Sequence, residues 1–185
     1  ASDVYKRQIQ TSQRIFKRGG RKAMMYVVQT KTGCELSSGV LLKRLGFNIK
    51  IPEKLMSIRR GGIWRLEKKL VFTGYIFLES DKSITEKDYY KVKNTDGVIN
   101  FIGKGKPQAI RENEIPFINW LWNNGKPIEP SRVFVTVDGR KMIMSGPLRK
   151  YGGEYASIDI RQRRAKTVIS ICGIKHKVTL PIELI

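Results

Sequence analysis

The sequence predicts an α+β fold in two parts, an α+β domain at residues 25–125 and an all-β barrel at residues 132–185. In the first part, apolar runs of strand length alternate with segments of helical periodicity. In the second part, short strand-like runs alternate with Gly-containing turns, which is typical of a small barrel. The Gly- and Pro-containing residues 126–131 are the expected linker. Residues 1–24 are polar, basic and aperiodic, so we interpret them as a disordered or non-native extension, or alternatively as a short RNA-binding arm.

The elements of both parts are expected from their apolar runs and their flanking residues. In the first part they are a strand at 25–30, a helix ending at Leu45, a strand from Ile49, a hairpin of strands 56–60 and 63–70, a strand at 71–79, a helix at 83–93, a strand at 97–102 and a helix at 112–124. Thr85 is a suitable helix cap, and Pro116 is compatible only with a first turn. The barrel strands are expected at 133–137, 141–144, 154–159, 167–172 and 177–180.

The first helix is expected to begin with a capping box. The Thr32 hydroxyl would accept a hydrogen bond from the Glu35 backbone N–H, and the Glu35 carboxylate would reach back. Leu36, Val40 and Leu41 recur at helical spacing, so they are the expected buried face.

The net charge points to a polyanionic partner. The chain has 36 Lys and Arg residues against 16 Asp and Glu residues, a formal charge of +20 and a pI near 10.2. The excess is spread along the whole chain, so a basic tail alone does not account for it. Nucleic acid is the partner that best neutralises such a charge, although a solubility effect is the alternative.

The chemistry-bearing residues indicate neither an enzyme nor a metal protein. Cys34, Cys172 and His176 are too few for a four-ligand zinc site, and Cys172 lies in an apolar run typical of a core residue. We recognise no nucleophile, phosphate-binding loop or carboxylate constellation, so no cofactor is expected. No apolar run approaches the roughly 20 residues that cross a bilayer. We therefore expect a soluble, monomeric, non-catalytic protein.

Four groups of motifs carry a family resemblance. They are Met25–Gln29, Ile58–Gly61 with Phe72–Ile76, Asn94–Gly103, and the barrel residues Gly146–Leu148, Gly153-Glu154, Ile158-Asp159, Val178 and Leu180. In order and spacing these resemble the NusG family of bacterial transcription elongation factors. The resemblance implies an amino-terminal NGN domain, with an antiparallel sheet flanked by helices, and a carboxy-terminal SH3-like KOW barrel. It also implies a cytoplasmic factor without catalytic activity.

The resemblance implies that the first domain binds the clamp of RNA polymerase. The residues it places on that surface are Tyr26, Phe72, Thr73, Gly74 and Tyr75. Aromatic anchors supply much of the binding energy in such interfaces. The alternative is that these aromatics are core, and strand alternation puts at least one of Phe72 and Tyr75 inside.

DNA contacts are a weaker expectation. Arg59, Arg60 and Arg65 flank the hairpin tip, where Trp64 either stacks on a base or packs on the hairpin. Asn94 and Thr95 resemble a dipeptide that faces the non-template strand in some relatives. The alternatives are a solvated basic hairpin and ordinary turn chemistry, and we rank the turn first for Asn94-Thr95.

The barrel is the expected RNA-binding part. Three basic stretches, each expected in a turn, supply the candidates Arg149, Lys150, Tyr151, Arg161, Arg163, Arg164, Lys166, Lys175, His176 and Lys177. If the turns cluster at one end of the barrel, they form one positive patch with aromatic rings for stacking. The alternative is a set of solvated charges.

Two departures from the family pattern indicate a specialised member. Leu148 stands where the family has a Phe that docks a ribosomal protein or the termination factor Rho. Residues 161–166 are more basic than usual, which resembles the LoaP group of antiterminators that recognise an RNA hairpin. A third departure, Thr73 in place of Pro, loosens the turn before Gly74. The alternatives are a housekeeping NusG factor whose barrel binds proteins and a ribosome-associated KOW protein.

Overall fold

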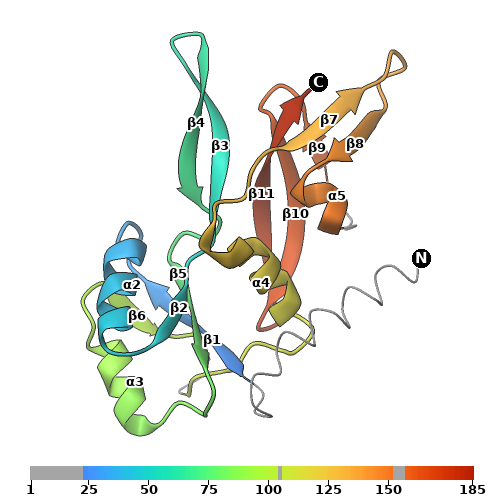
Figure 1. Cartoon of the computed structure of the whole chain (residues 1–185). Helices are drawn as coiled ribbons and strands as arrows, with labels where there is room; N and C mark the ends of the chain where they lie inside the picture. The colour runs from blue at the N-terminus through green and yellow to red at the C-terminus, as the bar shows by residue number, and fades with distance from the viewer. Residues whose placement is uncertain (1–22, 104–105, 152–156) are drawn as a thin grey trace. The chain divides into compact units, whose positions relative to one another are not determined.

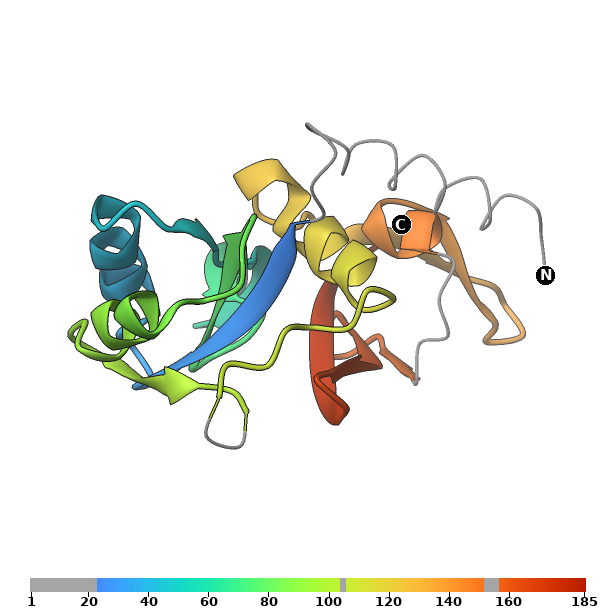
Figure 2. The same ribbon diagram turned by 90° about the horizontal axis from the view of Figure 1, so that it is seen from below.

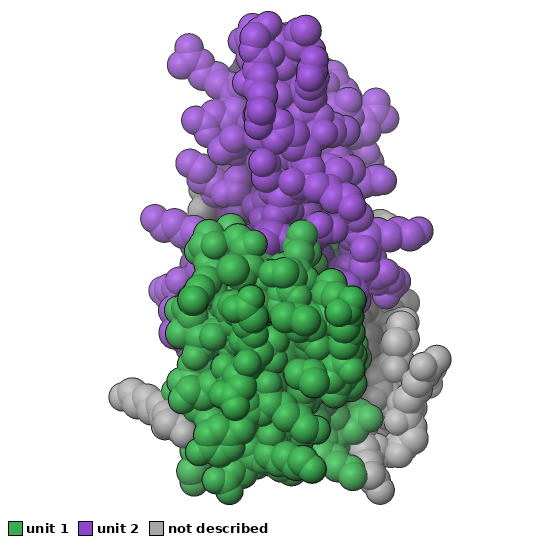
Figure 3. All heavy atoms as spheres, turned by 90° about the vertical axis from the view of Figure 1, so that its left-hand side faces the viewer, with its two compact units in different colours: residues 1–51, 72–120 green, residues 52–71, 121–185 purple. Residues whose placement is uncertain are grey.

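A computed structural model describes residues 23–103, 106–151 and 157–185. The chain divides into two compact units (Figure 3), one of Ala1–Ile51 with Phe72–Trp120 and the other of Pro52–Val71 with Leu121–Ile185. The second unit therefore includes a segment from the middle of the expected first domain. The domain boundaries at 25–125 and 132–185 stay predictions, and the expected extension at 1–24 lies almost wholly outside the described residues.

The first unit is built on a four-stranded antiparallel sheet of order β2-β5-β1-β6. Its strands are β1 (Met24–Thr30), β2 (Asn48–Lys50), β5 (Tyr75–Ser80) and β6 (Val98–Phe101). Helices α2 (Glu35–Arg44) and α3 (Glu86–Lys93) lie on the same side of this sheet in both ribbon views (Figures 1 and 2). Val28, Ile76, Phe77 and Leu78 are fully buried and form the centre of the core.

The expected start of α2 is wrong. Its N-cap residue is Cys34, and no side-chain hydrogen bond caps the helix among the described residues. The buried face is also displaced from the expected one, because Leu36 and Val40 are 55% and 51% exposed whereas Leu42 is fully buried. Gly39 explains the shift: a Cβ there would lie 2.5 Å from Ile51 Cδ1, so the helix approaches the sheet through its small residues.

Other helix signals are confirmed. The Thr85 side chain accepts a hydrogen bond from the Asp88 backbone N–H at 3.1 Å, which caps α3. Helix α4 (Ile115–Trp122) has Pro116 at its second position, where the missing N–H costs nothing.

Strand β5 begins at Tyr75, later than expected, because Gly74 adopts φ +80° and interrupts the extended backbone.

The second unit contains the hairpin of β3 (Glu53–Arg60) and β4 (Ile63–Leu70) and a curled five-stranded sheet. The order of that sheet is β8-β7-β11-β10-β9, with β7 (Ser131–Val135), β8 (Lys141–Ser145), β9 (Ser157–Asp159), β10 (Arg164–Ile171) and β11 (Ile174–Leu184). Within this sheet β7 and β11 pair in parallel, and the other neighbouring strands pair antiparallel. A 3-10 turn (Asn123–Gly125) and the short helix α5 (Pro147–Tyr151) complete the unit. The α+β fold class is confirmed.

The expectation that all three basic stretches lie in turns is wrong. Arg149 lies in helix α5, Arg164 begins β10, and Lys175 to Lys177 belong to β11. Arg164 pairs with Pro181 at one end of the β10–β11 ladder, whereas Ile171 pairs with Ile174 at the other. At roughly 3.3 Å per residue, Arg164 and Lys175 are about 20 Å apart along this ladder, whereas Lys166 and Lys177 are about 7 Å apart. The two stretches therefore run along the ladder and are not clustered in turns at one end of the barrel.

Candidate functional site

A buried carboxylate holds the turn that precedes β5. Glu35 is 2% exposed, and its Oε1 accepts a hydrogen bond from the Gly74 N–H at 2.6 Å while its Oε2 accepts one from the Gly33 N–H at 2.8 Å. The Gly74 carbonyl in turn accepts from the Thr30 N–H at 2.8 Å. A buried carboxylate requires such donors, and these bonds fix Gly74 against both β1 and the start of α2.

Some of the residues expected to contact polymerase are buried, and the others are accessible at the surface. Tyr26 and Phe72 are 4% and 6% exposed, and they pack edge-on against Phe101 and Phe77. Thr73 is exposed and Tyr75 is half-buried, on either side of the buried Gly74. The turn therefore leaves Thr73 and Tyr75 accessible at the surface, above the buried rings of Tyr26 and Phe72.

The hairpin tip is basic and its arginines are partly engaged. Arg59 and Arg60 are both exposed. Arg59 donates through Nε to the Gly62 carbonyl at 3.2 Å, and Arg60 forms a 3.1 Å ion pair with Glu67. A hydrogen bond from Lys69, and secondarily the charge of Arg60, lowers the pKa of Glu67. Arg59 is thus the arginine of the pair that is not neutralised by Glu67.

Asn94 and Thr95 occupy the turn after α3. Asn94 is the exposed C-cap residue, and its backbone N–H donates to the Tyr90 carbonyl at 2.9 Å. Thr95 is buried, and its hydroxyl donates to the Lys91 carbonyl at 2.9 Å. Turn chemistry therefore accounts for Thr95, and Asn94 is the accessible member of the dipeptide.

The barrel candidates occupy several surfaces. Arg149, Arg161, Lys166, Lys175 and Lys177 are exposed, whereas Arg163, Arg164 and His176 are half-buried. Burial lowers the pKa of His176. The Arg149 guanidinium donates to the Met144 carbonyl, and Lys150 and Tyr151 belong to the same short helix α5.

Two contacts between the hairpin and the barrel were not expected from the sequence. The Arg163 guanidinium lies over the Trp64 ring, with Cζ 4.4 Å from the ring centroid. Lys54 is 8% exposed and donates through Nζ to the Thr179 carbonyl at 2.7 Å. Burial, and secondarily the charge of Arg164, lowers the pKa of Lys54 to about 8. No local sequence signal reports either contact, because each joins residues far apart in the chain.

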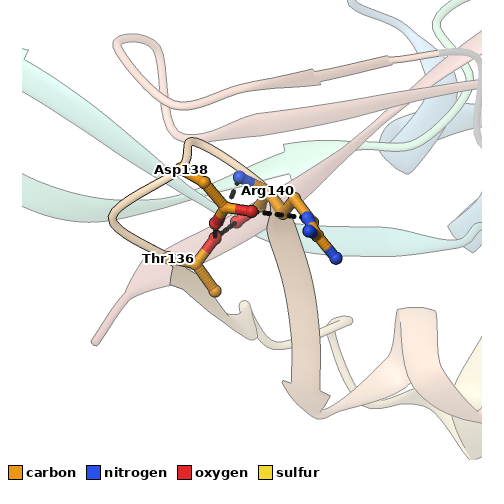
Figure 4. Close-up of polar contacts among 3 residues, drawn as sticks. All are labelled: Thr136, Asp138 and Arg140. Carbon is orange, nitrogen blue, oxygen red and sulfur yellow. Dashed lines mark hydrogen bonds and ion pairs between the residues drawn. The ribbon is translucent and has the colours of Figure 1, made fainter.

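The turn between β7 and β8 was also not singled out. The Thr136 hydroxyl donates to the Asp138 carboxylate and accepts from the Arg140 backbone N–H at 3.0 Å (Figure 4). Asp138 also forms an exposed ion pair with Arg140. The hydrogen bond from Thr136 is the main cause that lowers the Asp138 pKa. These contacts stabilise a tight turn, and they do not form a candidate catalytic or binding site.

The described residues carry neither a metal-site signature nor a membrane-span signature. There, no group of three or more His, Cys, Asp and Glu side chains could hold a metal ion. Cys34 and Cys172 are half-buried cysteines that form no disulfide within the described residues. No helix in the described ranges is both long and apolar enough to cross a membrane.

Comparisons with known proteins place this geometry in a family. The family model described as "Transcription termination factor nusG" matches residues 24–119. The chain is 33% identical over 171 residues to the transcription termination/antitermination protein NusG of Rickettsia felis, covering 86% of this chain and 85% of the relative. It is 26% identical over 168 residues to the same protein of Bacillus subtilis, covering 84% and 93%.

A solved structure shares the fold. It is described as "Domain interaction in Thermotoga maritima NusG", and it has a TM-score of 0.54 and 23% identity, covering 87% of this chain and 94% of that one. The chain therefore belongs to the NusG family of transcription termination/antitermination proteins.

Proposed function

We propose that this chain is a non-catalytic, monomeric elongation and antitermination factor of the bacterial cytoplasm. Its NGN domain at residues 25–125 binds the RNA polymerase clamp, and its KOW domain at residues 132–185 binds nascent RNA. The observation that carries the polymerase assignment is the turn held by Glu35, because a rigid turn presents Thr73 and Tyr75 without an ordering cost on binding.

The polymerase surface consists of Thr73, Gly74 and Tyr75, supported from below by Tyr26 and Phe72. Half-buried Tyr75 can bury its remaining ring surface in a partner while its hydroxyl stays wet, as tyrosines at interfaces commonly do. Binding to the elongating conformation of the polymerase would disfavour its paused state by population shift.

The polymerase proposal is tested with the full chain and core RNA polymerase. Tyr75→Ala should weaken binding at least about tenfold, because a central aromatic at an interface is often worth more than ~1.4 kcal/mol. Tyr90→Ala is the matched control, since Tyr90 is a 52% exposed tyrosine on α3. Equal affinities of both variants and the native chain would reject this surface.

The RNA surface is proposed on the strand β10 side of the barrel, with Arg161, Arg163, Arg164 and Lys166. Exposed Arg161 and Lys166 flank the half-buried pair, so positive charge is continuous from the turn into the strand. Arg149, Lys150 and Tyr151, which belong to α5, are proposed as a further RNA contact. Lys175, His176 and Lys177 would form a second, separate contact, because they lie toward the other end of the ladder.

RNA binding is tested by gel shift against a hairpin RNA over a range of salt. Arg161→Glu with Lys166→Glu should weaken binding and reduce the salt slope by about two phosphate contacts. Lys43→Glu with Arg44→Glu, two exposed residues of α2, controls for net charge. Equal losses in both double variants would indicate nonspecific electrostatics and reject the site.

The LoaP-like specialisation is part of the same proposal. Leu148, at the position where the family has Phe, is 2% exposed, and its backbone N–H donates to the Ser131 hydroxyl at 2.9 Å. A buried side chain offers no anchor to a docking protein, which favours RNA recognition over the housekeeping alternative. In vitro transcription past a terminator, with and without a candidate leader hairpin, tests this. Leader-independent read-through would favour the housekeeping factor, and co-purification with ribosomal subunits would favour the ribosome-associated alternative.

Two separate proposals concern non-template DNA, one at Arg59 and one at Asn94. Both side chains are exposed, whereas Arg60 is paired with Glu67 and Thr95 is buried. Arg59→Ala and Asn94→Ala should each reduce crosslinking to the non-template strand in an elongation complex, and unchanged crosslinking in both would exclude the contact.

A further inference from the structure

The starting observation is a stacked pair that joins the hairpin to the barrel. Arg163 Cζ lies 4.4 Å from the centroid of the Trp64 ring. Trp64 lies on β4 and Arg163 lies in the turn before β10, so the pair connects residues far apart in the sequence within one compact unit. Both side chains are half-buried, which leaves part of each accessible.

The backbone of Arg163 is held from two sides. Its φ is +52°, in the left-handed region that residues other than glycine rarely adopt. Its N–H donates to the Ile160 carbonyl at 3.2 Å, and its carbonyl accepts from the Ile182 N–H at 3.1 Å. A strained backbone conformation persists only when surrounding contacts hold it. The two backbone hydrogen bonds therefore hold Arg163 in this conformation and fix the direction in which its side chain leaves the barrel.

The hairpin that carries Trp64 is anchored independently. Lys54 on β3 donates to the Thr179 carbonyl of β11 at 2.7 Å. Within the hairpin, Trp64 pairs across the strands with Arg59. The position of the indole is therefore set by the β3–β4 pairing and by the hydrogen bond of Lys54 to Thr179, and not by Arg163 alone.

The surface around the pair is strongly basic. The hairpin Glu53–Leu70 contains six Lys and Arg residues and two Glu residues. Both carboxylates are already paired, Glu67 with Arg60 and Lys69 and Glu53 with Lys68. Exposed Arg59 lies directly opposite Trp64 in the hairpin ladder, and exposed Arg161 lies two residues before Arg163. A polyanion is the ligand that such a surface fits.

We propose that Trp64 and Arg163 form a stacking site for an unpaired RNA base, with Arg161 and Arg59 contacting the flanking phosphates. The proposal rests on the RNA-binding role of the barrel and adds the hairpin to it. An indole and a guanidinium plane both stack on bases, and bases are available for stacking only where the RNA is single-stranded. The guanidinium can stack through its face while its edge donates to a phosphate.

The test compares three variants of the full chain. Trp64→Leu keeps an apolar side chain but removes the π face, and Trp64→Phe restores a smaller one. Arg163→Asn removes the guanidinium but keeps a residue that tolerates the left-handed backbone. Fluorescence anisotropy measures binding to labelled oligouridine, to a fully paired RNA hairpin and to oligothymidine, at two salt concentrations. Circular dichroism confirms that each variant is folded.

Trp64→Leu should weaken oligouridine binding about 5- to 160-fold, the loss expected when one stacking aromatic is removed. Its salt slope should stay the same, because no charge is lost, and Trp64→Phe should recover most of the affinity. Arg163→Asn should weaken binding and also lower the salt slope by about one. Binding to the fully paired hairpin should change little in Trp64→Leu.

The failures of this proposal and of the barrel proposal are distinguishable. If Trp64→Leu binds oligouridine like the native chain while Arg161→Glu with Lys166→Glu does not, the barrel binds RNA and the stacking site is rejected. If neither set of variants changes RNA binding, the barrel proposal itself fails. If oligothymidine binds more tightly and loses the same factor in Trp64→Leu, the ligand is DNA and the assignment to RNA is overturned.

Discussion

Glu35 at the start of α2 accepts a 2.6 Å hydrogen bond from the backbone N–H of Gly74, 39 residues further along the chain. The same carboxylate accepts from the Gly33 N–H at 2.8 Å. One side chain thus satisfies two backbone donors and joins the first helix to the turn proposed to contact polymerase.

Glu35→Ala should lower the free energy of unfolding by about 3 kcal/mol, because two backbone donors lose a charged acceptor. Glu35→Gln should cost less, about 1–2 kcal/mol, since its one carbonyl oxygen replaces only one acceptor. Urea unfolding measures both. Glu86→Gln, an exposed carboxylate in the first turn of α3, is the control and should change stability by under ~1 kcal/mol. Indistinguishable results for Glu35→Ala and the control would contradict a structural role for the carboxylate.

Much of the fold could be predicted because its signals are local. Thr85 marks a helix start through its side-chain cap, Pro116 and the hairpin tip glycines mark boundaries through backbone geometry, and all lie where expected. The buried face of α2 could not be predicted from hydrophobicity. Close approach at Gly39 decides it, and that approach depends on Ile51 and the sheet beyond it.

The candidate sites show the same division. The sequence identified the basic residues of the barrel but placed Arg164 and Lys175 in turns, although both lie in strands. The charge of a residue marks it as a candidate for RNA binding but does not report where it lies along a strand. The pairing register of β10 and β11 places residues 161–166 and 175–177 at different positions along the ladder. The pairing of Trp64 with Arg163 is a tertiary contact, so no pattern within either segment could predict it.

The face of α2 can be tested with two leucines of the same helix. Leu42→Ala should cost about 3–4 kcal/mol, because Leu42 is fully buried and its truncation leaves a cavity. Leu36→Ala should change the free energy of unfolding by less than ~0.5 kcal/mol, since Leu36 is 55% exposed. Chemical denaturation of both variants compares them directly. A larger loss for Leu36→Ala would restore the face that the sequence alone favours.

Gly97 and Gly46 form a matched pair of glycines with positive φ. At Gly97, φ is +78° and a Cβ would lie 2.7 Å from Cys34 Cβ and 2.4 Å from Ser38 Oγ. At Gly46, φ is +90° and no heavy atom of the described chain lies within 4 Å of such a Cβ. Both alanine variants carry backbone strain of about 1–2 kcal/mol, so Gly97→Ala should cost roughly 1–3 kcal/mol more because of the clash. Equal melting temperatures would mean that α2 moves freely away from this turn.

Lys54 predicts a pH dependence of stability. Burial lowers its folded-state pKa from 10.5 to about 8, so between these values the unfolded chain binds more protons than the folded chain. Stability contributed by Lys54 therefore rises with pH through this window, by on the order of 3 kcal/mol in total. Lys54→Met should remove this rise, which urea unfolding from pH 7.5 to 10.5 would measure as a changing difference from the native chain. Lys175→Met, at an exposed position of β11, controls for the loss of one positive charge. A constant difference between Lys54→Met and the native chain across this window would show that Lys54 is not buried against the barrel in solution.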